Sequence, residues 1–517
     1  MAKRRIISFL NDQRGAVAAT YAMALVGLVV IGGVGFDYGR LMAMDSELQN
    51  GADQAALAGA TQLDGKSGAC SRAAAAAIGL VTNKTLLAND SNTISVANET
   101  ACDATGSVRF WQDKLATTAA TGDANAKFIE LDVDVRTVRY AFTPLTSLLV
   151  GTLKAGAMAG LGSSVCKVPP VFMCNPAETA TNLGPDFDTT SLIGHGIKLL
   201  AGSPTAPGNF GFLDSNGGNA TSDLAKMLGY DQVPFDCVAA DQVGLNPGQK
   251  EVVFNAFNTR FDIDTNGANT CPGSGTCSAA LNSRKDLIRK NQCGTTGNNG
   301  WQEANTPYRP TSATAEMTSG YPDIMGHPRD MCHAVSFDGS CSYTSGSTTT
   351  NASPIGDGSW DRNAYFKVNY GLDPSQWQSL TGLGSTASRY AVYQWEKANT
   401  SYLASQSVAS PNGGFAAYSQ PVCRTPQSSS DPDRRRFVMA VVNCLSQATK
   451  IAGNGKVDIL KWVDVFLVEP AFNRGNGASK RTTDDQVYVE VIGGSTLGGG
   501  GSIAAQTIRR DVPYLVH

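Results

Sequence analysis

A short acidic stretch near the middle of the chain has the spacing of a calcium-binding loop. Asp262, Asp264 and Asn266 alternate and are followed by Gly267, as in the first half of a loop whose alternate oxygen atoms converge on Ca²⁺. The twelfth position, where such loops carry a bidentate glutamate, is Gly273, so that carboxylate would have to come from elsewhere in the chain. The alternative is an Asp/Asn/Gly turn that needs no ion. Calcium is therefore the one cofactor hypothesis that these residues raise.

The cysteines form the largest set of side chains with chemistry of their own. All 12 follow the N-terminal apolar run, and an even number of cysteines with this distribution is typical of disulfides formed in an oxidising compartment. Proximity in the sequence suggests the pairs Cys70–Cys102, Cys166–Cys174, Cys271–Cys277, Cys332–Cys341 and Cys423–Cys444, with Cys237–Cys293 as the remaining pair. Spacing alone leaves the connectivity open.

Zinc binding is the alternative to a disulfide at one place, because Cys332 and His333 lie near His327 in the sequence. The sequence has no Cys-x-x-Cys pair and only 4 histidines, which disfavours conventional tetrahedral zinc sites. It also lacks the Gly-x-Ser-x-Gly elbow, the His-Glu-x-x-His motif and a phosphate-binding Gly-rich loop. We therefore expect a protein that is not an enzyme.

The composition favours an exported, loop-rich protein. The chain holds 55 glycines, only 16% of its residues are charged, and its net charge of -3 offers no basic surface for a nucleic acid. One cationic cluster, Arg434 to Arg436, lies just after Asp431 and Asp433. We predict that this cluster is an exposed loop.

The N-terminus has the pattern of a membrane anchor. Basic residues precede an uncharged apolar run, 16–36, which at about 1.5 Å per residue in a helix can cross a hydrocarbon core of roughly 30 Å. A secretory signal peptide is the alternative, but its apolar region would be shorter and would end in a small-x-small cleavage site. Because cytoplasmic flanks are rich in Lys and Arg, the head, 1–15, is expected inside and the remainder outside.

Beyond the apolar run, the spacing of apolar residues predicts that the helix continues from Asp37 to about Leu63. One face of this extension consists of small residues, which let another backbone approach closely. They are Gly51, Ala52, Ala55, Ala58 and Gly59. Two hypotheses follow: the face binds a partner helix, or it packs against the protein's own domain.

Three sequence elements in this region carry a resemblance to a known family. They are Arg14-Gly15-Ala16-Val17-Ala18, Phe36-Asp37-Tyr38-Gly39-Arg40, and Leu48-Gln49-Asn50-Gly51-Ala52-Asp53-Gln54-Ala55-Ala56-Leu57-Ala58-Gly59-Ala60. Their order and spacing resemble the N-terminus of TadE/TadG-like proteins of the tight-adherence (Tad, or Flp) pilus systems of bacteria. The resemblance covers about the first 65 residues. It implies a role in pilus assembly, with pilins or other pilus components as partners.

The chain departs from this family in two ways. Prepilin processing requires Glu and Tyr at the fifth and sixth positions after the glycine, whereas Gly15 is followed there by Thr20 and Tyr21. Cleavage after Gly15 is therefore an open hypothesis, and assembly as a major pilin is not expected. Some TadG-like chains also carry a von Willebrand A domain, whose Asp-x-Ser-x-Ser metal motif occurs here at 338–342. The preceding strand is too short and a Ser/Gly-rich loop follows, so no such domain is expected.

The remaining sequence predicts an α+β fold. Alternation over 128–142 predicts a half-buried strand that packs on the long helix, as in pilins, and alternation over 486–492 and 502–508 predicts a hairpin. Helices are expected over 247–261 and 385–399. The predicted organisation is a cytoplasmic head, 1–15, a transmembrane helix, 16–36, a helix extension with a pilin-like α+β region, 37–176, and a loop-rich, disulfide-bonded periplasmic α+β domain, 177–517, of one or two parts.

These observations predict a single-pass protein of the bacterial inner membrane with most of its mass in the periplasm. It would act as an assembly or anchoring component, or as a minor pseudopilin, of a Tad/Flp-type pilus through non-covalent contacts. One alternative is a membrane-displayed adhesin or sugar-binding module, stabilised by calcium, with Trp360, Trp377 or Trp395 exposed. A second is a periplasmic hydrolase whose site the motifs do not reveal. No nucleic acid is expected as a partner, and the oligomeric state is open.

Overall fold

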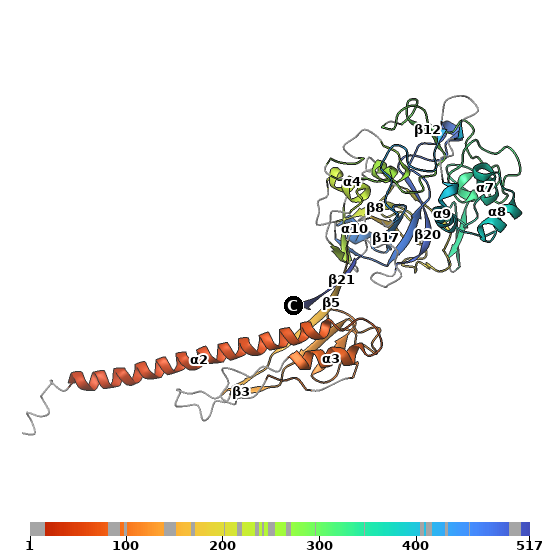
Figure 1. The fold of residues 1–517 in the computed structure, drawn as a ribbon. Helices are drawn as coiled ribbons and strands as arrows, with labels where there is room; N and C mark the ends of the chain where they lie inside the picture. Colours follow the sequence, from red (N-terminus) through yellow and green to blue (C-terminus); the bar gives the residue numbers. More distant parts are fainter. Residues whose placement is uncertain are drawn as a thin grey trace, which may run out of the picture. The chain divides into compact units, whose positions relative to one another are not determined.

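The computed structural model divides the chain into two compact units (Figure 1). Unit 1 consists of Met1–Gly162 and Asp511–His517, and unit 2 consists of Ser163–Arg510. The structure describes residues 16–80, 94–97, 101–138, 151–166, 171–200, 202–214, 220–232, 237–239, 242–246, 254–264, 270–273, 275–294, 296–345, 347–403, 408–409, 416–429, 433–453, 455–495 and 508–516.

The division differs from the predicted boundary at residue 176. Strand β21 (Ile508–Val516) lies beside β5 (Gly156–Cys166) in the sheet of unit 1, so the C-terminus returns to the N-terminal unit. The chain leaves this sheet along β5 and comes back along β21, which makes unit 2 an insertion between two neighbouring strands. Of the hairpin predicted over 486–492 and 502–508, residues 502–507 lie outside the described residues, and β20 (Gln486–Gly494) pairs with two other strands of unit 2.

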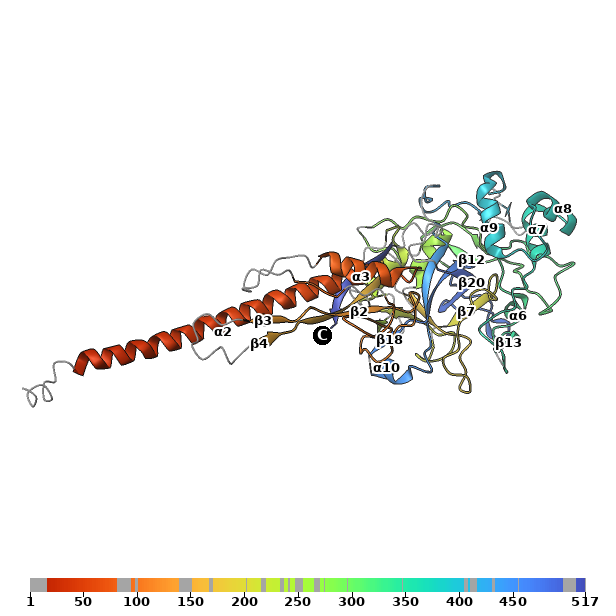
Figure 2. The ribbon, with the colours of Figure 1, turned by 90° about the horizontal axis from the view of Figure 1, so that it is seen from below.

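A single helix, α2 (Ala16–Ala60), includes both the apolar run and its extension (Figure 2). It is 45 residues long and unbroken, which confirms the predicted continuous helix. A second helix, α3 (Ala69–Leu80), packs on the C-terminal part of α2 through a face of alanines. The sheet of unit 1 continues with β1 (Val108–Trp111) and β2 (Phe128–Asp132), in the order β1-β2-β5-β21.

Alternation along β2 positions this sheet against the helix. Ile129 and Leu131 are buried in the core shared with α2, while Glu130 between them pairs with Arg109 at 2.8 Å. The predicted strand over 128–142 is broken within its described part, 128–138, because the backbone changes partner after Val133: Val133 N–H still donates to Ala155, next to β5, whereas Asp134 N–H donates to Ser95. A separate strand, β3 (Arg136–Val138), then pairs with β4 (Gly151–Leu153).

An eight-stranded sheet forms the centre of unit 2, in the order β18-β10-β8-β6-β17-β19-β20-β7. The strands other than β20 are β18 (Lys456–Asp458), β10 (Gln242–Asn246), β8 (Phe210–Leu213), β6 (Val171–Cys174), β17 (Arg436–Val442), β19 (Lys461–Leu467) and β7 (Gly196–Leu200). Its neighbours pair antiparallel except β6 and β17, which run parallel. Both faces are covered, since Phe437, Met439 and Val441 enter one apolar cluster and Val438, Ala440 and Val442 the other.

Smaller sheets and short helices complete unit 2. Four strands, β12 (Trp301–Glu303), β11 (Leu287–Arg289), β16 (Ala416–Ala417) and β15 (Val408–Ala409), form a second sheet, and β13 (Ser342–Ser345) and β14 (Thr348–Asn351) form a hairpin. Strand β9 (Cys237–Ala239) pairs with the end of β5. The helices are α4 (Thr221–Gly229), α5 (Phe254–Asn258), α6 (Met331–Ala334), α7 (Arg362–Tyr370), α8 (Pro374–Thr381), α9 (Arg389–Ala398) and α10 (Ala448–Ala452). This mixture confirms the α+β fold class with a long apolar N-terminal helix.

Helix α9 matches the helix predicted over 385–399 and is held to the main sheet by charge. Glu490 on β20 accepts hydrogen bonds from the backbone N–H groups of Arg389 and Tyr390 at 2.9 and 2.8 Å, so a carboxylate lies at the positive end of the helix. The fully buried Arg389 side chain pairs with Glu490 at 2.8 Å and with Asp330 at 2.7 Å. These contacts make α9 an integral part of the core of unit 2.

Candidate membrane anchor and helix-packing face

Most of the N-terminal half of α2 has no protein around it, although Gly33 and Asp37 are buried. Leu28 and Ile31 are 69% and 71% exposed, and only 6% of the most apolar 18-residue window is buried. That window has a mean hydropathy of 2.2, so the helix is long and apolar enough to cross a membrane. A core helix of a soluble protein with this composition would be mostly buried. The exposed apolar surface is therefore the expected surface of a membrane anchor.

The C-terminal half of α2 is packed within unit 1. Ala52 and Ala55 are completely buried, together with Ala73, Ala77 and Ile129. A Cβ atom added to Gly59 would lie 2.6 Å from Ile129 Cδ1, and one added to Gly51 would lie 3.3 Å from Ile94. Ala58 is half-buried. Of the two hypotheses for this face, the structure supports packing within the protein's own domain. Side chains of α3 and β2 already occupy the space beside the small residues.

Four glycines within the span or just beyond it have different surroundings. Cβ atoms built on Gly27, Gly32, Gly35 and Gly39 would meet nothing within 4 Å. Gly35 and Gly39 are four residues apart and so lie on one face of the helix. A second helix can therefore pack closely on this face, but not at Gly59.

The start of α3, which covers the extension of α2, is fixed by an acidic side chain. Asp123 accepts hydrogen bonds from the backbone N–H groups of Cys70 and Gly68 at 2.9 and 2.8 Å, and these bonds lower the pKa of its carboxyl group. Cys70 forms a disulfide with Cys102 beside it. Cys70, Cys102 and Asp123 have the proximity of metal ligands, but the disulfide accounts for both sulfur atoms.

The predicted calcium loop has another role in the part that the structure describes. Asp262 is buried, has a positive φ of 65°, and accepts hydrogen bonds at 2.7 to 3.1 Å from the backbone N–H groups of Val422, Cys423 and Arg424. Burial raises the pKa of this carboxyl group, and the three N–H groups act in the opposite direction. Asp264 pairs with Arg424, and Asn266 lies outside the described residues. The geometry favours a turn that anchors the 422–424 segment.

The disulfides correct part of the predicted connectivity. Cys70–Cys102, Cys271–Cys277 and Cys332–Cys341 form as sequence proximity suggested. The pairs Cys166–Cys174, Cys423–Cys444 and Cys237–Cys293 are wrong, because Cys174 is bonded to Cys444 and Cys293 to Cys423. Cys166 and Cys237 lie opposite each other in the backbone register of β5 and β9, and their side chains are outside the described residues.

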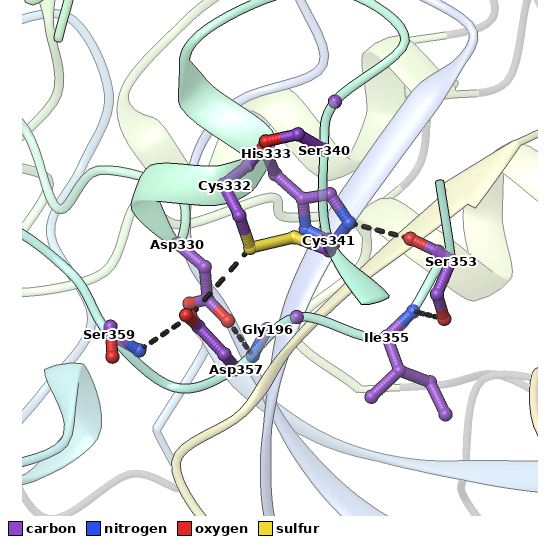
Figure 3. The surroundings of a disulfide bond; sticks show 12 residues. Gly196, Asp330, Cys332, His333, Ser340, Cys341, Ser353, Ile355, Asp357 and Ser359 are labelled. Carbon is purple, nitrogen blue, oxygen red and sulfur yellow. Dashed lines mark hydrogen bonds between the residues drawn. A yellow bond between two sulfur atoms is a disulfide. The ribbon is translucent and has the colours of Figure 1, made fainter. Parts of the chain in front are cut away.

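The environment of the Cys332–Cys341 disulfide leaves no room for the zinc hypothesis at His333 (Figure 3). His333 is buried, its Nε2 lies 2.8 Å from the Ser353 carbonyl oxygen, and its Nδ1 lies 2.9 Å from the Tyr488 hydroxyl oxygen. Burial lowers the pKa of His333 to about 4, so the ring is neutral at neutral pH. Both sulfur atoms and both ring nitrogens are thus engaged by the protein.

Two other sequence features have plain structural roles. Asp338, Ser340 and Ser342 are exposed and follow helix α6, not the hydrophobic strand that a von Willebrand A metal site needs. Trp360 and Trp377 are buried and Trp395 is half-buried, so these aromatic side chains do not form the exposed cluster that a sugar-binding surface would present.

Arg434 and Arg435 are buried and Arg436 is half-buried, contrary to the predicted exposed loop. Arg434 donates to the backbone carbonyls of Tyr230 and Gly229 at 2.7 and 2.5 Å, and Arg435 donates to those of Leu467 and Val468 at 3.0 and 2.8 Å. Arg436 pairs with Asp464 on β19. These arginines stabilise the interior of unit 2, and no residue near them in the sequence signals the distant carbonyl groups that bind them.

Comparison with known proteins gives one match. Residues 15–62 match a family model described as "Putative Flp pilus-assembly TadE/G-like". The matched segment is α2 and the turn that follows it, so it includes both the exposed half and the packed half of the helix. No curated protein and no solved structure matches the chain. The N-terminal region is therefore TadE/G-like, as the residue pattern indicated.

Proposed function

We propose that this chain, whose N-terminal region is TadE/G-like, is a membrane-anchored component that assembles or anchors a Tad/Flp-type pilus, or is a minor pseudopilin of it. The observation that carries this proposal is the matched helix itself: one end has its apolar surface uncovered, and the other end is built into a helix-on-sheet unit. The chain acts through non-covalent contacts, without a catalytic step.

The proposed location is the bacterial inner membrane, with the N-terminus in the cytoplasm and both units in the periplasm. Lys3, Arg4, Arg5 and Arg14 precede the apolar run and support this orientation. Disulfides in both units are compatible with an oxidising compartment beyond the membrane.

The proposed partner-binding surface is the face of α2 that contains Gly35 and Gly39. Helices in a membrane associate where small residues allow close packing, and here these glycines have open space around them. The small-residue face at Ala52 and Ala55, for which a partner helix was one of two hypotheses, is unsuited to this role because the protein's own core covers it. Partner helices would be those of the secretion platform or of pilins.

The test is to express the full chain with a C-terminal tag in a bacterium that has a Tad locus. The intact mass and the distribution among inner membrane, sheared pili and medium are then measured. An unprocessed mass in the inner membrane is expected for a resident assembly factor, and a mass truncated after Gly15 in sheared pili is expected for a minor pseudopilin. Release of the protein into the medium, in soluble form and without any pilus, would refute both versions of the proposal.

A further inference from the structure

A pocket in unit 2 is lined by an unusual number of arginines. Its walls are formed by Asp286, Tyr308, Met325, Gly326, His327, Pro328, Arg329, His333, Ala334, Glu469, Arg474, Arg481 and Thr482. Three guanidinium groups therefore meet two carboxylates at this surface. The lining side chains therefore carry one more positive than negative charge.

The two carboxylates are already used by two of the arginines. Asp286 binds Arg474 through two hydrogen bonds of 2.6 and 2.8 Å. Glu469 binds Arg329 at 2.7 Å and also lies 3.6 Å from Arg474. Arg481 has no carboxylate within ion-pair distance in the described part of the chain, and one of its terminal nitrogens donates to the Ala334 carbonyl oxygen.

Donor groups remain at the wall of the pocket. Arg329 is only 4% exposed, and its Nη1 atom is buried without a hydrogen-bond partner among the described residues. The Nε atom of Arg481 is also buried without a hydrogen-bond partner among the described residues. A buried guanidinium N–H without an acceptor costs free energy, and such a group calls for an acceptor that the protein does not supply.

The histidines of the pocket do not add charge. Burial lowers the pKa of His327 and of His333 to about 4 each, so both rings are neutral at neutral pH. Arg309 and Glu303, which both interact electrostatically with Arg481, lie 3.6 Å apart and offset each other. The charge that a ligand would meet therefore comes from the three arginines and the two carboxylates.

We propose that this pocket binds the carboxylate or phosphate group of a small ligand, with Arg329 and Arg481 as its donors. An N–H group of a guanidinium donates a strong, charge-assisted hydrogen bond to a carboxylate or phosphate oxygen. Arg474 is held by Asp286 and contributes charge without a free donor. The site is independent of the membrane helix, so it adds a binding function to unit 2.

The experiment measures thermal unfolding of the purified full chain in detergent against increasing sodium phosphate or sodium acetate, at ionic strength kept constant with sodium chloride. A ligand that binds the folded state raises the unfolding temperature in a saturable way. A response to phosphate only would identify a phosphate site, and a response to acetate only a carboxylate site. Absence of a saturable response to both anions would overturn the proposal.

Two variants and a matched control locate the response. Arg329→Gln and Arg481→Gln should each weaken anion binding by about tenfold or more, the loss expected when a charge-assisted hydrogen bond is removed. Arg436→Gln is the control, since Arg436 is similarly buried and paired in the same unit but does not line the pocket. If Arg329→Gln does not fold, anion binding by Arg481→Gln alone tests whether the pocket is the binding site. Unchanged binding in both pocket variants, or equal loss in the control, would contradict the assignment.

Discussion

Both halves of α2 contain glycines and alanines, and these small residues have opposite surroundings in the two halves. Around Gly35 an added Cβ would meet nothing, whereas at Gly59 it would strike Ile129 and lie 3.1 Å from the Ala73 carbonyl oxygen. Small residues in one half let α3 and β2 approach the helix, and in the other half they leave a face open. The comparison shows that a stripe of Gly and Ala marks where another helix or strand can pack closely on α2. It does not show whether that helix or strand belongs to the same chain.

The largest effect should come from Gly59→Leu. The side chain has no space between Ile129 and Ala73, so we expect unit 1 to lose about 3 kcal/mol or more of stability, at the upper end of overpacking effects. This loss would be measured by unfolding the full chain in detergent with a chemical denaturant. The resistance of unit 1 to a protease would report its folded fraction at each denaturant concentration. A variant as stable as the wild type would show that Gly59 is not closely packed against Ile129 and Ala73.

A smaller effect is expected from Gly59→Ala, and it should depend on Ile129. The added methyl group meets Ile129 Cδ1, which costs about 1–2 kcal/mol, partly offset by the higher helix propensity of Ala. Ile129→Val removes that atom, so the double variant should lose less stability than the sum of the two single variants. Strict additivity in this double-mutant cycle would contradict the contact.

The attachment of α3 should respond to acid through Asp123. Because its hydrogen bonds lower the pKa of Asp123 in the folded state, their contribution is complete above about pH 4 and is lost as the pH falls through the lower folded value. Unfolding temperatures between about pH 5 and pH 2 should therefore fall less steeply in Asp123→Asn than in the wild type. An equal pH dependence of the unfolding temperature in the wild type and in Asp123→Asn would show that the Asp123 carboxylate does not stabilise the start of α3.

The smallest effect on stability should come from Gly35→Leu, which serves as the matched control for Gly59→Leu in the same helix. With nothing within 4 Å, the substitution should change the free energy of unfolding by less than about 0.5 kcal/mol. If this face binds a partner helix, recovery of pilus components with the tagged chain should nevertheless drop. Equal recovery with wild type and variant would argue that the partner surface lies elsewhere.

The sequence predicted what local patterns determine. The apolar run and the three-four spacing after it predicted α2, and the helix expected over 385–399 corresponds to α9, because these signals depend on neighbours within a few turns. The occupant of the small-residue face could not be predicted, since Ile129 approaches it from a strand far along the chain.

Long-range pairing accounts for the errors. Cys174 and Cys444 are 270 residues apart and meet because β6 and β17 run parallel with Cys174 opposite Val442. Nothing in the spacing of cysteines gives that register. The insertion of unit 2 has the same cause, since β21 pairs with β5, a segment far from it in the sequence. Burial of Arg435 likewise depends on carbonyl groups of Leu467 and Val468.

The most direct test of the central claim is site-specific photo-crosslinking in a bacterium with a Tad locus. A photoreactive residue would replace Leu28 in the uncovered half of α2 or, as a control, Leu115 in unit 1, which are 69% and 74% exposed. The account predicts a protein adduct from position 28 that depends on the Tad locus, and none of that kind from position 115. Absence of any locus-dependent adduct at position 28, in a chain correctly inserted in the membrane, would contradict it.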